Sequence, residues 1–514
     1  MRKRSILAVA GTVVAMLAAV PPAAATASSS SRTFYVDCAA GSDSAAGTTQ
    51  KTAWRTLGRA SAEVYRPGDS IRLRRSVTCA GDFTPQGSGT AAAPVTLGAY
   101  GSGTKPKIVG TGGLAAVHLL NVQGWEVSDL EVTNHGPAPA AQEPRFGILV
   151  QLNDFGTGSY YRVRRVDVHD VNGCDCQDRH TAVPSGGVVF WVTGSAVPTT
   201  FADVQVAAST VRDVASEGIA TESSWQKRAE FPSGPGTAFV PITGLVVKGN
   251  EVTHVTGDGI GIFASVDAKV EGNIVRDYGY ATSLFRVGIG VGNANGTVLQ
   301  YNTVTDGNGP NPSQAFAIDH AANRTVVQYN LTQRNNGGAL LFCNGAGETA
   351  VGNIYRFNVS DDDHPTGSYG FGAPLAVYNI PCPAVGDLSI YGNTAWTAVG
   401  TTLVSNFQGA TTSFTDNVFV GPAAGAAIVD PYSSYDHNLY HRVSPPAADT
   451  TAIVGDPLLA APGTNSAEGY RLRAGSPALD TGVPVAHAGS RDYFGNKLTV
   501  PWNIGADQGA GVTG

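Results

Sequence analysis

Three acidic residues stand out because each lies at or beside the start of a short apolar segment. They occur in Ser216-Glu217-Gly218-Ile219, Gly257-Asp258-Gly259-Ile260 and Ala317-Ile318-Asp319-His320. Paired carboxylates can hydrolyse a glycosidic bond, with retention at about 5 Å separation and inversion at about 6.5–9.5 Å. One carboxyl group protonates the leaving oxygen while the other attacks or activates water. These segments are therefore candidates for acid–base chemistry on a sugar.

Our preferred assignment makes Asp258 and Asp319 the acid and the base, with Glu217 as a third participant. We expect five further residues to contact the substrate. The guanidinium of an arginine would orient a carboxylate, a histidine would bond to the sugar or tune Asp319, and aromatic rings would stack on sugar rings; these residues are Arg286, His320, Trp225, Tyr278 and Tyr280. The alternative is structural, because an aspartate before a glycine is also a common turn residue.

The elements that must position these side chains can be recognised by a repeat in the sequence. A short alternation of apolar and polar residues closes on asparagine six times, and another β-branched segment follows each time. The asparagines are Asn250, Asn273, Asn302, Asn330, Asn358 and Asn393, at spacings of 23, 29, 28, 28 and 35 residues. A period in the twenties suits one coil of a solenoid built from three short strands and three turns.

The asparagine has a mechanical role in such a coil. It tolerates the left-handed backbone of a tight turn, and its amide can bond to the asparagines stacked above and below it. A β-sandwich would need regular hairpin turns, and a β-propeller would repeat at longer and more even intervals. The pattern therefore predicts an all-β, right-handed parallel β-helix with an N-terminal cap.

Stacked coils would bring distant acids together. Equivalent residues of neighbouring coils lie about 4.8 Å apart, the normal strand spacing. Glu217 and Asp258 share the same local phrase, so we expect them on successive coils. Asp319 lies two coils after Asp258, which predicts a separation of roughly 9–10 Å. Long insertions, Asn134 to Pro144 and Thr221 to Thr237, should form loops on the binding side.

The first 27 residues have the pattern of a secretory signal. Arg2, Lys3 and Arg4 precede an apolar run, and Ala25-Thr26-Ala27 supplies small residues for cleavage. Without the three basic residues of this segment, 30 of the 33 basic residues remain against 40 acidic ones, a net charge of −10. Phosphate binding needs clustered lysine and arginine, which argues against nucleic acid as a partner. We expect a secreted monomer with no membrane contact after signal cleavage.

Six cysteines in an exported chain favour disulfides over metal binding. Their order suggests the pairs Cys38–Cys79, Cys174–Cys176 and Cys343–Cys382, although six cysteines allow fifteen connectivities. Two cysteines separated by one residue, with no second pair nearby, are a weak signal for zinc. We therefore predict no metal and no cofactor for a hydrolase.

The opening of the chain resembles secreted right-handed parallel β-helix proteins of the pectate-lyase-like superfamily. The resemblance rests on Phe34-Tyr35-Val36-Asp37, Trp54-Arg55-Thr56-Leu57 and Pro67-Gly68-Asp69-Ser70-Ile71. Near the end, Gly475-Ser476-Pro477-Ala478-Leu479-Asp480 and Asn503-Ile504-Gly505-Ala506-Asp507 look like the usual final coils. The resemblance implies a capping helix and first coil at the front. It is specific for the fold and much less so for the chemistry.

The predicted organisation is a signal peptide (1–27), a cap with the first coils (28–110), a central β-helix with the active groove (111–430), and C-terminal coils with an extension (431–514). We expect a polysaccharide or oligosaccharide substrate and a glycoside hydrolase. One alternative is a polysaccharide lyase, in which Asp361-Asp362-Asp363 and the acids above could hold calcium. The other is a non-catalytic carbohydrate-binding or adhesion solenoid, in which those acids would be dispensable.

Overall fold

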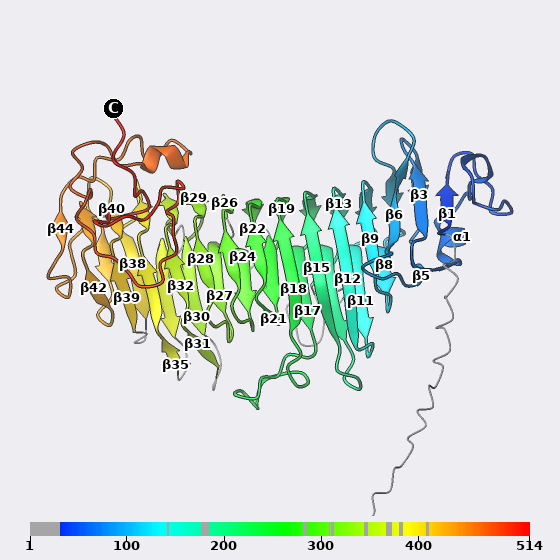
Figure 1. Ribbon diagram of the computed structural model, residues 1–514, viewed down its shortest axis with the longest axis horizontal. Helices are drawn as coiled ribbons and strands as arrows, with labels where there is room; N and C mark the ends of the chain where they lie inside the picture. Colours follow the sequence, from blue (N-terminus) through cyan, green and yellow to red (C-terminus); the bar gives the residue numbers. More distant parts are fainter. Residues whose placement is uncertain are drawn as a thin grey trace, which may run out of the picture.

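The computed structural model describes residues 31–513, apart from 141–142, 176–183, 281–284, 308, 310–312, 344–347, 366–372, 380–383 and 408–410. The chain winds through successive coils stacked along one axis, so that its two ends lie at opposite ends of a long solenoid (Figure 1). Each coil contributes one strand to each of three long sheets, and the strand pairs within these sheets are parallel. The predicted parallel β-helix is confirmed.

Sheet 1 holds 15 strands among the described residues. In spatial order they are β1 (Thr33–Val36), β3 (Ser70–Arg74), β6 (Val95–Tyr100), β9 (Trp125–Ser128), β12 (Thr157–Arg164), β15 (Thr200–Ala207), β18 (Ile242–Lys248), β22 (Lys269–Glu271), β25 (Val298–Gln300), β28 (Val326–Gln328), β32 (Ile354–Arg356), β36 (Leu388–Tyr391), β39 (Thr412–Thr415) and β42 (Ser434–Asp436), with β21 (Ser265–Val266) beside β18.

Sheet 2 follows sheet 1 in each coil and holds 14 strands within the described ranges. They are β4 (Thr78–Ala80), β7 (Lys107–Val109), β10 (Glu131–Asn134), β13 (Asp167–Val171), β16 (Thr210–Val214), β19 (Glu251–Val255), β23 (Ile274–Tyr278), β26 (Thr303–Thr305), β29 (Leu331–Gln333), β33 (Val359–Asp361), β37 (Thr394–Trp396), β40 (Val418–Val420), β43 (Leu439–His441) and β44 (Ile453–Val454).

Sheet 3 closes the coil, and 11 of its strands fall in the described part of the chain. They are β8 (Ala115–Leu120), β11 (Phe146–Asn153), β14 (Gly186–Thr193), β17 (Glu217–Ser223), β20 (Ile260–Phe263), β24 (Arg286–Gly292), β27 (Ser313–Asp319), β30 (Ala339–Cys343), β34 (Leu375–Asn379), β38 (Thr402–Phe407) and β41 (Ala427–Val429). Two-stranded pairs are formed by β2 (Val64–Tyr65) with β5 (Gln86–Gly87) and by β31 (Thr349–Val351) with β35 (Ala384–Gly386).

The interior is filled by the inward-facing half of each alternating strand. Valine, isoleucine and leucine dominate one continuous core that runs from Phe34 to Val443. β-Branched side chains suit this position because they pack well on a pleated surface. At the N-terminal end the core becomes aromatic, with Phe34 stacked on Trp54 at 4.9 Å between ring centroids. The alternation read from the sequence therefore holds along the solenoid.

A ladder of buried asparagines lines the turn between sheets 1 and 2. Asn330 shows the pattern, because its Nδ2 donates to Oδ1 of Asn358 at 2.9 Å and its own Oδ1 accepts from Asn302 at 3.0 Å. All six predicted asparagines belong to it, and the ladder continues through Asn417 and Asn438. Asp449 ends it by accepting from Nδ2 of Asn438. Each buried amide thereby satisfies its neighbour, which is what burial of a polar group demands.

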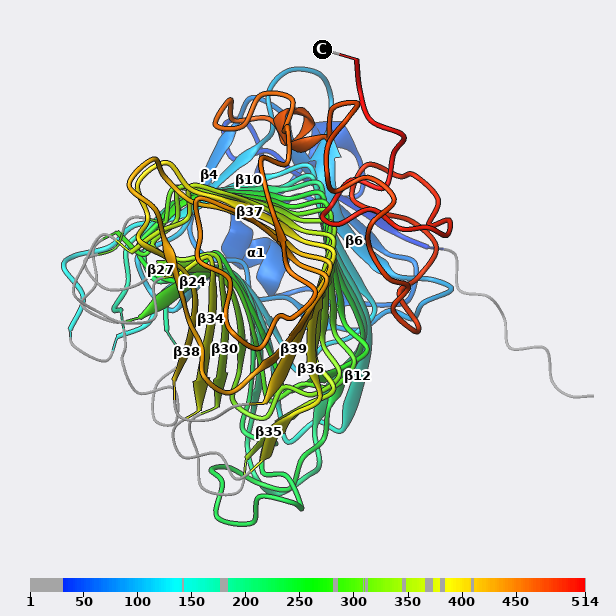
Figure 2. The ribbon, with the colours of Figure 1, turned by 90° about the vertical axis from the view of Figure 1, so that its left-hand side faces the viewer.

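The N-terminal end of the solenoid is covered. The helix α1 (Leu57–Ser61) begins at Thr56, whose side chain accepts from the backbone N–H of Arg59, and it buries Leu57 and Ala60 against the core. Figure 2, viewed along the axis, shows α1 across the end of the coils. The short helices η1 (Gln50–Thr52) and η2 (Ala467–Tyr470) belong to the cap and to the C-terminal extension. The capping helix implied by the resemblance is confirmed.

The C-terminal extension folds back along the outside of the last coils. Tyr470, Leu472 and Ile504 pack on residues of sheet 2 such as Val418, while Trp502 joins a second cluster around Phe357. Within the described residues, no helix is long and apolar enough to cross a membrane. The predicted signal segment lies outside the described residues.

The disulfide between Cys38 and Cys79 is present and closes the N-terminal cap. Cys174 is also disulfide-bonded. Its predicted partner Cys176, and Cys382 of the third predicted pair, lie outside the described residues, as does the side chain of Cys343.

Candidate functional site

The outer face of sheet 3, meaning the side directed away from the core, carries the candidate carboxylates. Along β17, Ile219 enters the core, whereas Ala220 and Glu222 alternate to the outside. Glu217 does not follow this alternation, but its Oε2 lies 3.4 Å from where a Cβ on Gly261 would be, beside the outward-facing Ala220. Loops that interrupt the coils border this face: the described residues 135–140 and 143–145 precede β11, 172–175 and 184–185 precede β14, and residues 224–241 follow β17. Figure 2 shows the loop after β17 extending beyond the coils. The predicted insertions thus flank one sheet, although Thr221 to Ser223 of the second belong to β17 itself.

Glu217 and Asp258 lie side by side on successive coils, as their shared phrase predicts. Gly218 donates its N–H to the carbonyl of Asp258, and Ala220 pairs with Gly261 two positions further on. Their backbones are therefore one strand spacing apart, about 4.8 Å. The side chains are largely enclosed, at 1% exposed for Glu217 and 7% for Asp258. We call Glu217 and Asp258 the acidic pair.

Asp319 does not join this pair, and the predicted register for it is wrong. Asp319 pairs with Gly292 on β24, and Gly292 pairs with Phe263 on β20. Asp319 is thus aligned with Phe263, five residues beyond Asp258, which corresponds to about 16 Å along a strand in addition to the two coils. The expected separation of 9–10 Å from Asp258 does not occur, because Asp319 ends its strand rather than beginning it.

Arg286 contacts a carboxylate, as expected for an orienting residue. Its guanidinium lies 3.5 Å from Oε1 of Glu217 and also bonds to Oδ1 of Asp175 in the loop before β14. Asp258 is held differently, because its Oδ1 accepts the backbone N–H of Val287 at 2.9 Å. Glu217 thus contacts a cation, and Asp258 is bonded to the backbone of the neighbouring coil.

Two of the aromatic residues predicted to stack on sugar lie in the core instead. Trp225 is 6% exposed and belongs to the main core cluster. Tyr278 is fully buried, and its hydroxyl donates within a cluster that includes Oδ1 of Asn335 at 2.9 Å. Burial also raises the pKa of Tyr278 well above its usual value. Residue type alone drew attention to these rings, but Tyr278 ends β23 and Trp225 lies in the loop after β17, and both rings turn into the core.

Tyr280 and His320 lie away from the acidic pair. Tyr280 stacks on His254, which belongs to β19 of sheet 2, with 4.3 Å between the ring centroids, so it is not on the outer face of sheet 3. His320 follows β27, where its Nε2 lies 3.5 Å from Asp319 and its Nδ1 lies 3.4 Å from Glu348. The predicted contact of His320 with Asp319 is therefore present, at the far end of the strand from Asp258.

Small residues form a floor beside the acidic pair. Ala220, Gly261, Gly290 and Ala317 pair in one row across four strands, and we call this row the floor. A Cβ placed on Gly261 would lie 3.4 Å from Oε2 of Glu217, so this carboxylate is directed over the floor. Gly261 and Gly290 are both partly exposed. The acidic pair therefore borders a strip from which side chains are missing.

The sequence interpretation missed three residues further along the same strands. Trp191 pairs with Glu222, and Phe263 is aligned with Gly292 and Asp319. They lack the short motif of acid, glycine and isoleucine that identified Glu217 and Asp258 as candidates. Alternation from Val189 to Trp191 in the β14 sequence GGVVFWVT is the one signal that could have placed an aromatic ring on this face.

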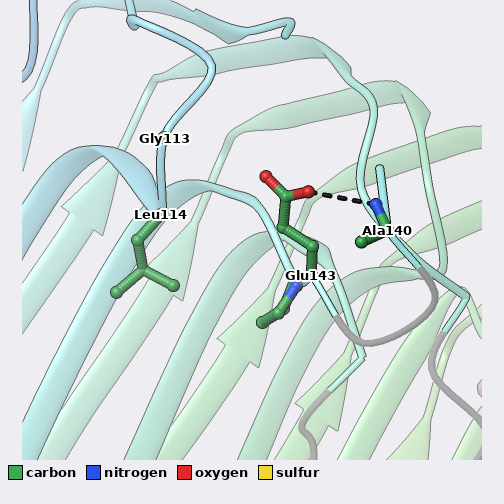
Figure 3. A pocket seen from close by; sticks show the side chains of 5 residues that line it. Gly113, Leu114, Ala140 and Glu143 are labelled. Carbon is green, nitrogen blue, oxygen red and sulfur yellow. Dashed lines mark hydrogen bonds between the residues drawn. The ribbon is translucent and has the colours of Figure 1, made fainter. Parts of the chain in front are cut away.

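A hollow of about 360 Å³ lies at the N-terminal side of the face, where β8 and β11 begin. Its lining includes Leu114 and Glu143 (Figure 3). One carboxylate oxygen of Glu143 accepts from the N–H of Ala140 at 3.0 Å, and the other accepts from Arg145 at 2.9 Å. The charge of this acid is thus compensated inside the loop itself.

The three consecutive aspartates considered as calcium ligands each accept hydrogen bonds from different residues. Asp361 accepts from Gln333, Asp362 accepts from Thr397, and Asp363 accepts from Ser360 and Thr332. Asp363 is completely buried, and this burial raises its pKa to about 6. Within the described ranges, no group of three or more histidine, cysteine or acidic side chains is arranged to hold a metal ion.

Comparison with known proteins agrees with the architecture. A family model described as a right-handed β-helix region matches residues 187–368. The chain is a right-handed parallel β-helix. A solved lacto-N-biosidase of glycoside hydrolase family GH136 from Eubacterium ramulus superposes with a TM-score of 0.61 at 20% identity, covering 82% of this chain and 68% of that chain. The structure of XylC in complex with xylose superposes with a TM-score of 0.53 at 11% identity, covering 93% and 98%.

A curated relative is similar in sequence as well. The lacto-N-biosidase of Bifidobacterium longum subsp. longum is 25% identical over 566 aligned residues, which cover 90% of this chain. The chain spans about a third of that relative's length, 34%. The likeness therefore extends through the whole β-helix and not only through its repeats.

Proposed function

We propose that this protein is a secreted-type glycoside hydrolase that cleaves an oligosaccharide at the acidic pair. The observation that carries the proposal is the adjacency of Glu217 and Asp258 on successive coils, with the Glu217 carboxylate over the floor. The strand spacing of about 4.8 Å between their backbones is compatible with the carboxyl separation of about 5 Å in a retaining glycosidase. The similarity to a lacto-N-biosidase over nine-tenths of the chain supports the same reaction class.

The contact of Glu217 with Arg286 supports an assignment of the roles. A nucleophile must be ionised, and the guanidinium of Arg286 beside Glu217 favours the ionised carboxylate. Glu217 attacks the anomeric carbon, the bond to the leaving oxygen breaks, and Asp258 gives that oxygen its proton. Asp258 then takes a proton from water, the water oxygen bonds to the anomeric carbon, and the ester to Glu217 is released.

The first substrate to test follows from the name of the relatives. Purified protein is incubated with 4-nitrophenyl lacto-N-bioside and with an oligosaccharide ending in lacto-N-biose, and the first-formed anomer is followed by NMR. We expect hydrolysis with retention. Products bearing an unsaturated uronate, from a uronate-containing glycan, would instead establish a lyase. Absence of turnover across a panel of neutral glycans would contradict the hydrolase.

An extracellular location belongs to the same proposal. The disulfide between Cys38 and Cys79 supports folding in an oxidising compartment, where such bonds form and persist. Expression with the native first 27 residues should place the protein in the culture medium of a secreting host, and mass spectrometry of the product would locate the cleavage after Ala27.

A further inference from the structure

An apolar cluster occupies the outer face of sheet 3 next to the acidic pair. It consists of Ala115, Phe146, Leu149, Val189 and Ala220, with Trp191 packed against them. These residues come from the four neighbouring strands β8, β11, β14 and β17. Such clusters belong inside the solenoid, yet this one lies on the side that faces away from the core. Trp191 is only half-buried, whereas the five residues beneath it are nearly inaccessible.

The indole of Trp191 extends back toward the acidic pair. Its ring centroid lies 6.4 Å from that of Phe146. Phe146 pairs with Gly186, which in turn pairs with Glu217, so Phe146 is aligned with the acidic pair. The indole therefore covers the apolar cluster between the row of Trp191 and the row of Glu217. Its partial exposure leaves part of the ring open on the outer face of sheet 3.

A second ring lies further along the same strands. A Cβ placed on Gly292 would come within 2.9 Å of two atoms of the Phe263 ring, so this ring covers the backbone of β24. Phe263 is half-buried as well. Trp191 pairs with Glu222, and Phe263 pairs with Gly292, so both rings belong to positions five residues, or about 16 Å, along the strands from the acidic pair.

We propose that Trp191 and Phe263 are sugar-binding platforms beyond the cleaved bond, so that the substrate runs along the strands of sheet 3 from the acidic pair to the two rings. This inference rests on the proposed function. Aromatic faces offer a large apolar area at fixed geometry, to which the C–H face of a pyranose can bind. Gly261 and Gly290 of the floor lie between the acidic pair and the platforms and leave room there for a sugar.

The charges around the platforms favour a neutral sugar over a uronate chain. Glu222 and Asp319 lie in the same row as the platforms, and the acidic pair lies behind them. Arg286 already contacts Glu217 and Asp175. An anionic chain would meet like charges at each of these points, whereas the hydroxyl groups of a neutral oligosaccharide can donate to the same carboxylates.

Binding and turnover are measured separately to test the platforms. In a Glu217→Gln background, isothermal titration with the oligosaccharide ending in lacto-N-biose compares Trp191→Ala, Trp191→Phe and Phe263→Ala. Either alanine variant should weaken binding about tenfold, and Trp191→Phe should restore most of it. Tyr301→Ala serves as the control, because Tyr301 is an exposed ring stacked on Tyr329 at the edge of sheet 1.

The outcomes separate this inference from the proposed function. Hydrolysis by the wild type, with unchanged binding and unchanged kcat/KM in both alanine variants, would overturn the platforms and leave the hydrolase standing. Binding that depends on Trp191 and Phe263, without hydrolysis by the wild type, would retain the platforms and overturn the hydrolase. Equal weakening by Tyr301→Ala would show a loss of general surface affinity and would also overturn the platforms.

Discussion

The turn between sheets 1 and 2 and the outer face of sheet 3 belong to the same coils, yet they use sequence in opposite ways. The turn repeats one residue, asparagine, through eight coils from Asn250 to Asn438. Across the outer face, aligned positions change from Phe146 to Glu217 to Gln314 as the coils advance. Repetition therefore marks the turn that stabilises the solenoid. The departure from repetition marks the outer face of sheet 3, where we propose that the substrate binds.

The largest expected effect is on catalysis. Glu217→Gln and Asp258→Asn should each lower kcat by about 10²–10⁴-fold, because general acid and nucleophile roles contribute on that scale. Steady-state kinetics on the lacto-N-bioside measure the loss. Glu271→Gln is the matched control, since Glu271 lies on sheet 1 and accepts from Gln300. Full activity of both Glu217→Gln and Asp258→Asn would show that the outer face of sheet 3 has no catalytic role that the turn lacks.

Removing one step of the asparagine ladder should affect folding and spare catalysis. Asn330→Ala deletes hydrogen bonds to Asn302, Asn358 and the carbonyl of Leu299, all of them buried. We expect a loss of about 3 kcal/mol in the free energy of unfolding, since the freed partners remain buried. Urea denaturation measures the loss. A comparable drop in kcat well below the unfolding transition would contradict the separation of roles.

A smaller effect is expected from pH at the C-terminal extension. Burial raises the pKa of Asp416 to about 8, while both of its oxygens accept the N–H of Val483. A carboxyl group with a raised folded pKa binds its proton more tightly when folded. Its contribution is therefore complete below pH 4 and is lost as the pH rises through about 8. Thermal unfolding at several pH values should show this slope, and Asp416→Asn should flatten it.

The smallest effect concerns the backbone beneath the Phe263 ring. Gly292→Ala would place a Cβ against the ring of Phe263, which can shift because it is the end of a side chain. We expect kcat/KM on the oligosaccharide to fall by a few-fold, roughly the 1 kcal/mol that an aromatic contact contributes, with little change in unfolding. An unchanged kcat/KM would place Phe263 outside the substrate path.

The sequence could predict the fold because its signal is repeated. Six asparagines in matching contexts define coils, and the same order of acid, glycine and isoleucine places Glu217 beside Asp258. The predicted register of Asp319 is wrong because its segment has no matching motif in a neighbouring coil. Its strand begins at Ser313, so the acid closes the strand, and nothing local distinguishes a carboxylate that ends a strand from one that begins it.

Aromatic residues were harder to place, for a physical reason. A shift of one residue in the phase of a strand exchanges inside and outside. Trp225 lies in a loop that returns to the core, so no alternation predicts its direction, whereas Trp191 follows the alternation of β14 to the outer face. The phase of the alternation in a strand must therefore be known to within one residue before an aromatic ring can be assigned to the core or to the site.

The helix α1 has a consequence beyond closing the core. A parallel sheet whose last strand is open offers a row of unpaired N–H and C=O groups to any other copy of the chain. Here α1 and the cap residues before it cover the N-terminal end. Without this cover, the first coil of one copy could pair with the last coil of another, and the molecule would become a subunit of a fibre.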